Sequence, residues 1–342
     1  MGYATYWIHD CEYKLVEPLL RVSDLRIVFG PRGREQVAVD GVNLTLAAGE
    51  VLGLVGESGC GKSLTALAIL GLLPRPAGRI ERGRIDFRGK DLVRASESEM
   101  NQVRGKDIAM IFQEPMTALN PVIKVGEQIA ETIRVHEGLP SSAARRRALE
   151  LLERVGISNP SQRIDQYPHE LSGGMRQRVM IAIALACRPK ILIADEPTTA
   201  LDVTIQAQIL ALLKDLQTEF GMAMILITHD LGVVAQVADR VAVMYAGRIA
   251  EQGTASEVLE SSAHPYTRAL LSSIPSLEQT SARLQTIAGM VPSLVNLPSG
   301  CRFHPRCTKA REQCAQHAPA LTALSLTHQA ACLALTGYQT NG

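Results

Sequence analysis

A glycine-rich segment with the sequence GESGCGKS has the composition of a phosphate-binding loop. It fits the pattern G-x-x-x-x-G-K-S through Gly56, Gly61, Lys62 and Ser63, between a short apolar run and an expected helix. Small residues let consecutive backbone N–H groups surround phosphates, and the N-terminus of a helix adds a favourable field. We expect Lys62 to reach the β- and γ-phosphates, and Ser63 to give its hydroxyl to Mg²⁺. Cys60 lies inside the loop, where its backbone matters more than its sulfur.

An apolar run at 191–194 ends in two adjacent carboxylates, Asp195 and Glu196. In α/β sheets, ligands bind at the carboxyl ends of the strands. Adjacent strand residues point to opposite faces, so the two carboxylates should have different roles. We expect Asp195 to hold Mg²⁺, directly or through water, and Glu196 to polarise the water that attacks the γ-phosphate.

A second candidate anion site begins at Leu171, where the sequence reads LSGGMRQR. Ser172, Gly173 and Gly174 at the N-terminus of an expected helix at 174–187 would bind an anion without any charged side chain. Because the chain already has a phosphate loop, a second anion site would serve a different anion. Taken alone, the same residues would predict only a helix N-cap.

The elements that must position these residues follow an α/β pattern. Residues 19–30 and 37–46 alternate in polarity and predict an antiparallel pair of strands. Further strands, interspersed with helices, predict a parallel, doubly wound sheet. These strands are expected at 51–55, 107–112, 191–195, 222–228 and 241–246, and a further strand is expected at 84–88. The helices are expected from Leu64 to Leu73, where Pro74 stops the first, and from 203 to about 219, where Gly221 ends the second.

Residues 114–174 differ in character and predict a helical insert, with helices at 123–135 and 141–155. In the second helix Ser141 or Ser142 is the expected N-cap. Its apolar stripe would contain Leu149, Leu152 and Val155. From about residue 256 the α/β pattern gives way to segments rich in Pro, Ser and His, which we interpret as a separate C-terminal extension at 256–342.

The composition limits the classes of partner. Lys plus Arg number 35 and Asp plus Glu number 34, so the net charge of +1 argues against a broad nucleic-acid-binding surface. No apolar run reaches the roughly 18 residues that a membrane helix needs, and the N-terminus does not resemble a signal peptide. A cytoplasmic location is expected, with a peripheral seat on a membrane protein left open.

Together these features resemble the nucleotide-binding domain of ABC transporters over residues 19–255. The resemblance implies the fold: a RecA-like P-loop core, an antiparallel β subdomain and the helical insert. It also implies that Gln113 touches Mg²⁺ and the membrane subunit, that His229 contacts the γ-phosphate, and that Phe29 stacks on adenine. The implied ATP contacts in and after the loop are Gly56, Glu57, Ser58, Gly59, Cys60, Gly61, Lys62, Ser63 and Leu64.

The resemblance also assigns residues to a dimer interface. Leu171, Ser172, Gly173, Gly174 and Gln177 would close over the ATP of the partner, and Ala200, Leu201 and Asp202 would form the loop that spans the interface. Longer stretches, among them HPYTRALL at 264–271 and GCRFHPRC at 300–307, resemble the ATPases of oligopeptide and dipeptide importers. That subfamily also serves nickel and other solutes, which stay open as alternatives.

The implied assembly contains a homologous second ATPase, two membrane subunits and an extracytoplasmic binding protein, with this chain on the cytoplasmic face of the membrane. A soluble ABC ATPase of translation or DNA repair is the main rival. Such proteins usually carry two of these domains in one chain or long coiled-coil inserts, and this sequence has neither feature.

Four of the seven cysteines cluster near the end of the chain, at Cys301, Cys307, Cys314 and Cys332. In a reducing compartment, clustered cysteines favour a metal site over disulfides. Four thiolates suit a [4Fe–4S] cluster or zinc, and reduced structural thiols remain a third possibility. Some peptide-importer ATPases carry an iron–sulfur cluster in this region, so the resemblance favours the cluster. A redox or iron sensor that gates transport is a further hypothesis.

Overall fold

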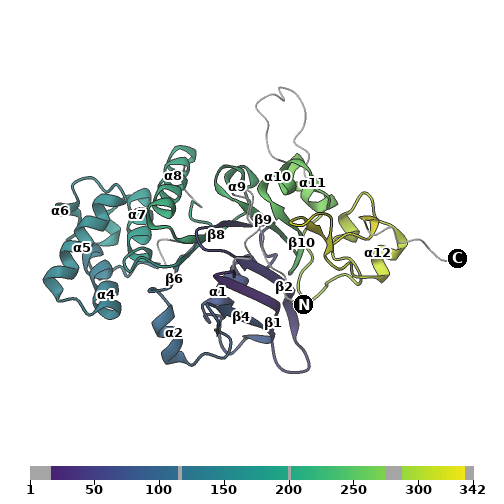
Figure 1. Ribbon diagram of the computed structural model, residues 1–342, viewed down its shortest axis with the longest axis horizontal. Coiled ribbons are helices and arrows are strands. Elements are labelled where there is room, and N and C mark those ends of the chain that lie inside the picture. Colours follow the sequence, from purple (N-terminus) through teal and green to yellow (C-terminus); the bar gives the residue numbers. More distant parts are fainter. Residues whose placement is uncertain (1–16, 115–117, 199–201, 274–286, 336–342) are drawn as a thin grey trace. The chain divides into compact units, whose positions relative to one another are not determined.

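The computed structural model describes residues 17–114, 118–198, 202–273 and 287–335. They form two compact units, one containing the described residues up to 94 and from 227 onward, the other containing 95–226 (Figure 1). The boundary falls within strand β8 (Ala223–Thr228).

An antiparallel sheet in the first unit confirms the predicted pairing of the first two strands. Its order is β2 (Gln36–Leu46), β1 (Leu20–Phe29), β4 (Gly78–Phe87) and β5 (Lys90–Asp91). β4 begins six residues before the predicted strand at 84–88. The added residues GRIERG have little apolar alternation, and their pairing with β1, from Phe29 opposite Gly78 onward, keeps them extended.

The second sheet of this unit has the order β11 (Thr322–Ala323), β12 (Gln329–Ala330), β10 (Arg248–Thr254), β9 (Arg240–Tyr245) and β3 (Val51–Val55). β3 and β9 are parallel, as predicted. β10 was not predicted; a two-residue turn joins it to β9. Ala246 and Gly247 in this turn have φ values of 43° and 85°, as the preferred hairpin turns require.

Short helices complete the first unit. They are α1 (Lys62–Ile69), α9 (Leu231–Val237), α10 (Ala255–Glu260), α11 (Pro265–Ser272) and α12 (Glu312–Gln316). The prediction that the first helix runs from Leu64 to Leu73 is wrong at its end. The helix stops at Ile69 because the next residues form its cap, with Gly71 at a φ of 64°, a value that favours glycine.

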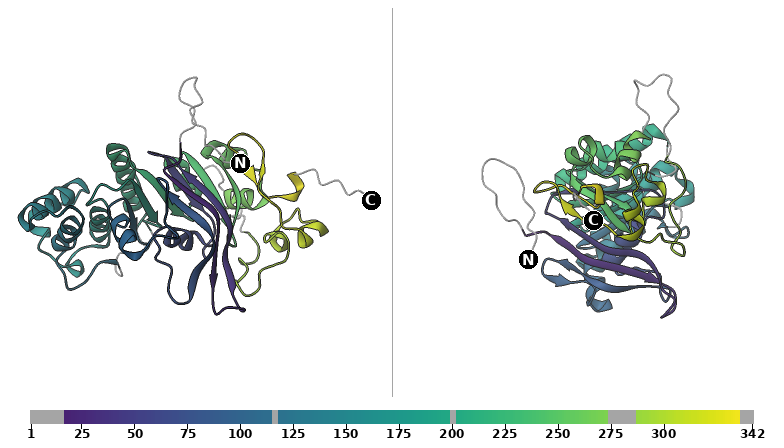
Figure 2. Two further views of the ribbon diagram at one scale, coloured as in Figure 1. Left: turned by 60° about the horizontal axis from the view of Figure 1, so that its bottom comes forward. Right: turned by 90° about the vertical axis from the view of Figure 1, so that its right-hand side faces the viewer.

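The C-terminal segments share the core of the first unit. Phe303 is buried against Tyr245 of β9 and Tyr266 of α11, with ring centroids 5.1 and 5.3 Å away. Glu251 of β10 is fully buried, and its carboxylate accepts hydrogen bonds from the backbone of Ala263 and His264. It also lies 2.7 Å from the His328 ring, next to β12. The yellow C-terminal segments lie beside the green strands in both views of Figure 2. These residues are therefore packed into the unit.

The second unit contains the rest of the parallel strands and a group of helices (Figure 1). Its strand order is β8, β7 (Ile191–Asp195) and β6 (Ile108–Ile111), and β6 and β7 are parallel. The helices are α2 (Glu97–Val103), α4 (Val125–Glu137), α5 (Ser141–Arg154), α6 (Pro160–Arg163), α7 (Gly173–Ala184) and α8 (Val203–Phe220). Helix α8 ends at Gly221, at a φ of 61°, as predicted.

Two details of the predicted insert are wrong. Neither Ser141 nor Ser142 caps α5: the N-cap is Pro140, and Ser141 is already the first helical residue. Leu152 and Val155 of the predicted stripe are buried, as expected, but Leu149 is only half-buried, and Ala144, Ala148 and Leu151 complete the buried face. The predicted stripe of large apolar residues did not include the two alanines of this buried face.

Within the part of the chain that the structure describes, no helix is both long enough and apolar enough to span a membrane.

Candidate functional site

The phosphate loop at 56–63 connects β3 to α1 in the first unit, and two glycines make its course possible. A Cβ on Gly56, which has a φ of 151°, would lie 2.1 Å from the backbone oxygen of Met244 in β9. A Cβ on Gly61, at a φ of 105°, would lie 2.7 Å from the Met244 side chain. A side chain at Gly56 would push the loop off the end of β9, because the clashing atom belongs to the backbone. At Gly61 the end of the Met244 side chain could shift, and the positive φ is what favours glycine.

Lys62 is buried, and its ammonium lies over the loop. Nζ donates to the carbonyl oxygens of Gly56, at 2.7 Å, and Glu57, at 3.0 Å. An ammonium group held on the loop in this way is suited to bind a phosphate oxygen. Burial raises the pKa of the Cys60 thiol, although the nearby Lys62 charge opposes the change. The thiol therefore stays protonated near neutral pH, in line with the expectation that its backbone matters more than its sulfur.

Glu57, the second residue of the loop, has two partners from the C-terminal part of the chain. Its backbone N–H donates to the hydroxyl oxygen of Tyr266 at 2.9 Å. Its carboxylate forms a two-point ion pair with Arg306, at 2.7 and 2.9 Å. Sequence reasoning missed both contacts. The one indication in the sequence was the HPY motif at 264–266. It contributed to the family resemblance, but no contact was predicted for it.

In the second unit, the structure brings together two predicted site residues from different strands. Asp195 ends β7 and is 4% exposed, and Glu196 follows it. Gln113 comes just after β6, and its Nε2 donates to Glu196 Oε2 at 2.8 Å. Glu196 has a φ of 46°, a left-handed conformation that is costly for glutamate and that clusters at functional sites.

The predicted partner-facing residues lie at the N-terminus of α7. Ser172 is the N-cap, and its hydroxyl accepts the Met175 N–H at 3.3 Å. Gly173 and Gly174 form the first turn, and Leu171 is buried. Gln177 is 2% exposed, and its Nε2 has no hydrogen-bond partner among the described residues. The Gln177 side chain is thus packed inside the unit and is not displayed on the exposed first turn.

The remaining predicted residues occupy loop and strand ends. His229 is exposed and follows β8 in the first unit, next to Asp230, which caps α9. Asp202 caps α8 by accepting the Ile205 N–H, whereas Ala200 and Leu201 lie outside the described residues. Phe29 ends β1, and its ring lies against Gly78, where a Cβ would be 2.9 Å away.

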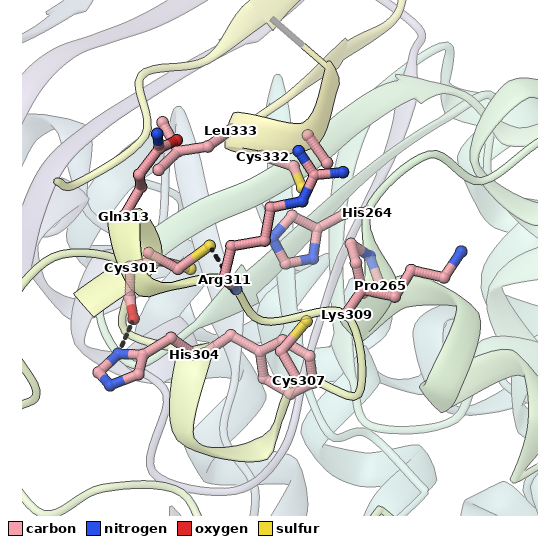
Figure 3. Close-up of a pocket in the computed structure, with 13 residues that line it drawn as sticks. His264, Pro265, Cys301, His304, Cys307, Lys309, Arg311, Gln313, Cys332 and Leu333 are labelled. Atoms are coloured by element: carbon pink, nitrogen blue, oxygen red, sulfur yellow. Dashed lines mark hydrogen bonds between the residues drawn. The ribbon is translucent and has the colours of Figure 1, made fainter. Parts of the chain in front are cut away.

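The four clustered cysteines line a single pocket in the first unit, together with His264 and Phe303. Figure 3 shows Cys301, Cys307 and Cys332 around this space. Burial raises the pKa of the Cys301 and Cys307 thiols, and the nearby Cys314 and Cys332 raise it further. Among the described residues, however, no three His, Cys, Asp or Glu side chains are arranged to hold one metal ion.

A loop of this pattern between a parallel strand and a helix, and a carboxylate pair at a strand end, define a P-loop nucleotide-binding protein. A family model described as ABC transporter matches residues 39–199, and one described as oligopeptide/dipeptide transporter, C-terminal region, matches 250–314. The oligopeptide transport ATP-binding protein OppD of Bacillus subtilis is 56% identical over 92% of this chain and 88% of its own length. The dipeptide transport ATP-binding protein DppD of Escherichia coli is 51% identical over 92% of this chain and 96% of its own.

Solved structures agree. A dimeric post-hydrolysis state of the ATP-binding cassette MJ0796, bound to ADP and Pi, has a TM-score of 0.62 and 28% identity, over 69% of this chain and 98% of that one. CbiO1 from Clostridium perfringens, part of an ABC transporter complex, has a TM-score of 0.60 and 31% identity, over 71% and 91%. The chain belongs to the ABC transporter family, and it carries the ATPase fold of that family.

The close approach of the loop to β9 should make the protein sensitive to a side chain at Gly56. Gly56→Ala should lower the melting temperature markedly, because its Cβ would collide with the backbone oxygen of Met244. Gly59→Ala is the matched control: it has a φ of 77° but nothing within 4 Å, so only backbone strain of about 1 kcal/mol applies. Thermal unfolding of the two variants compares the effects, and equal losses would show that the contact with β9 is unimportant.

Proposed function

We propose that this chain is the ATP-hydrolysing subunit of an ABC importer for dipeptides or oligopeptides. The observation that carries the proposal is that one chain matches both the ABC transporter family and the C-terminal region of oligopeptide/dipeptide transporters. Relatives that cover nearly the whole chain are named as peptide transport ATP-binding proteins, which supports the same substrate class.

The proposed chemistry assigns a role to each part of the site. The loop at 56–63 holds the phosphates, with Lys62 at the β- and γ-phosphates. Ser63, Gln113 and Asp195 would hold Mg²⁺ through oxygen atoms, which that ion prefers. Glu196 orients and polarises the attacking water, and its hydrogen bond from Gln113 supports this role by fixing the carboxylate. His229 contacts the γ-phosphate, and Phe29 stacks on adenine.

The proposal extends to a pair of ATPase subunits. Ser172, Gly173 and Gly174 serve the ATP of the partner, the buried Leu171 and Gln177 support them, and the loop at 200–202 links the two sites. The exposed N-terminus of α7 at Ser172 supports this assignment. Gln177 is buried one turn further along the helix, so its role would be to hold this N-terminus in place. The partners are a homologous second ATPase, two permease subunits and an extracytoplasmic binding protein, with this chain at the cytoplasmic face of the membrane.

We propose that the nucleotide-binding domain spans 19–255, that its helical insert spans about 114–174, and that the C-terminal extension spans 256–342. The extension is proposed as a sequence module, although its described residues share the core of the first unit. Nickel transport remains the alternative within the family, because the solute does not touch this subunit. A soluble ABC ATPase is disfavoured by the match to the transporter C-terminal region.

A [4Fe–4S] cluster is the proposed occupant of the cysteine pocket. Cys301, Cys307, Cys314 and Cys332 would hold it. Their positions around one pocket support a bound group, because a cation would compensate the thiolates that burial now disfavours. Zinc is the alternative occupant, because it also takes four thiolate ligands. A cluster spreads its thiolate ligands over four irons and would act here as a structural centre.

The catalytic assignment predicts a specific defect. Glu196→Gln should still bind ATP, but it should lose about 10²-fold or more of its ATP turnover in the assembled transporter, because the amide is no base. Uptake of a labelled dipeptide by cells should fall in parallel. The exposed Glu153→Gln is a matched control that should behave as wild type. Normal turnover by Glu196→Gln would remove Glu196 from the mechanism, and uptake of nickel but no peptide by the wild type would favour the alternative solute.

The cluster can be tested on protein purified without oxygen. We expect a brown protein with absorbance near 400 nm and about four irons and four sulfides per chain. Cys314→Ser should lose most of this absorbance, whereas Cys187→Ser, on α7's C-terminal side and outside the pocket, should keep it. Colourless protein with one zinc per chain would contradict the assignment.

A further inference from the structure

We propose that the C-terminal region is a working part of the nucleotide site, in which Arg306 and Tyr266 are positioning residues for the phosphate loop. They act by fixing Glu57 and by neutralising its charge. This inference rests on the proposed role of residues 56–63 in binding phosphate, and it assigns a function to two residues that lie more than 200 positions away in the sequence.

Hydrogen bonds and a ring contact fix the orientation of the Arg306 side chain. Its side chain is 5% exposed, and it pairs with Glu57 through both terminal nitrogens. Its Nε donates to the Ala288 carbonyl at 2.9 Å, and its guanidinium lies 5.8 Å from the centre of the Tyr245 ring. The guanidinium group of arginine stays charged in proteins, so the pair with Glu57 is a full ion pair. A two-point pair of this kind fixes direction as well as distance.

Tyr266 holds the backbone of the same residue. It is fully buried, and its ring lies 4.6 Å from that of Tyr245. The HPY motif sets its position: Pro265 is the first residue of α11, and the His264 ring accepts the Tyr266 N–H at 3.0 Å. With its ring immobilised, the Tyr266 hydroxyl accepts the Glu57 N–H. Both the backbone and the carboxylate of Glu57 are therefore held by the C-terminal region.

The charge of Glu57 makes this arrangement matter for ATP. Glu57 lies one residue after Gly56, inside a loop whose proposed ligand carries several negative charges. A carboxylate without a cation at that position would repel the phosphates, and the repulsion would be strong because the surroundings are partly buried. The pair with Arg306 removes this repulsion. Holding the loop in advance also reduces the entropy that is lost when the nucleotide binds.

The same two residues adjoin the cysteine pocket. Cys307 follows Arg306, and His264 lies two residues before Tyr266; both line the pocket (Figure 3). A displacement of the pocket wall would therefore move Arg306 or Tyr266, and each of these residues is hydrogen-bonded to Glu57. The contacts with Glu57 do not depend on which group the cysteines hold.

A double-mutant cycle on the full-length protein tests the inference, with the dissociation constant for Mg·ATP as the readout. Arg306→Ala should weaken binding about 10-fold or more, because it leaves the Glu57 carboxylate without its cation. Adding Glu57→Gln should restore most of that loss, since the amide carries no charge. Arg302→Ala is the matched control: Arg302 anchors the same segment to Asp40, at 2.8 Å, and should show no coupling with Glu57→Gln.

A second variant separates positioning from stability. Tyr266→Phe keeps the ring in its packing but removes the acceptor of the Glu57 N–H. We expect ATP binding to weaken about 2- to 10-fold while the melting temperature without nucleotide changes little. A purely structural role would give the opposite: a lower melting temperature and an unchanged dissociation constant.

The outcomes also distinguish this inference from the assignment of the loop. Lys62→Ala should weaken ATP binding if residues 56–63 hold the phosphates. If Lys62→Ala does so while Arg306→Ala changes the constant less than 2-fold, or while Glu57→Gln gives no rescue, the positioning role is wrong and the loop assignment stands. If Lys62→Ala has no effect, the loop assignment itself fails.

Discussion

The first unit depends on how closely the phosphate loop approaches the end of β9. Gly56 lies against the backbone oxygen of Met244, and the turn after β9 continues the contact. The N–H of Gly247 donates to the carbonyl of Cys60, and its own carbonyl accepts the N–H of Asp40, both at 2.8 Å. One tight turn thus links the loop and β2 to the β9–β10 hairpin through backbone hydrogen bonds.

Two arginines attach the C-terminal region to the elements that this turn joins. Arg302 pairs with Asp40 on one side, and Arg306 pairs with Glu57 on the other. Burial alone would raise the pKa of Asp40, but a hydrogen bond from Arg248 and the charges of Arg248, Arg302 and Arg26 lower it overall. The carboxylate therefore stays ionised near neutral pH. Ion pairs that are fixed at several points position their partners better than exposed pairs do.

Local patterns predicted the parts of the site that need only local sequence. The loop at 56–63 and the pair Asp195–Glu196 were predictable, because each depends on a strand and on the residues directly after it. Glu57–Arg306 was not, because the two residues are 249 positions apart and neither is unusual in its own segment. β10 was not predicted because its sequence is largely polar and shows no clear strand pattern. Its Glu251 is nevertheless buried, because the carboxylate is hydrogen-bonded by the backbone of Ala263 and by the ring of His328. Helix α1 was predicted too long because Pro74 looked like its stop, although Gly71 ends it first.

The central claim is that ATP binds a loop that the C-terminal region helps to hold. Hydrogen–deuterium exchange of the full-length protein, with and without Mg·ATP, tests it most directly. The account predicts slower exchange at 57–63 and, in the same experiment, at 264–267 and 304–307. Protection of the loop with no change in either C-terminal segment would contradict the coupling. Unchanged exchange at 57–63 under saturating ATP would contradict the claim as a whole.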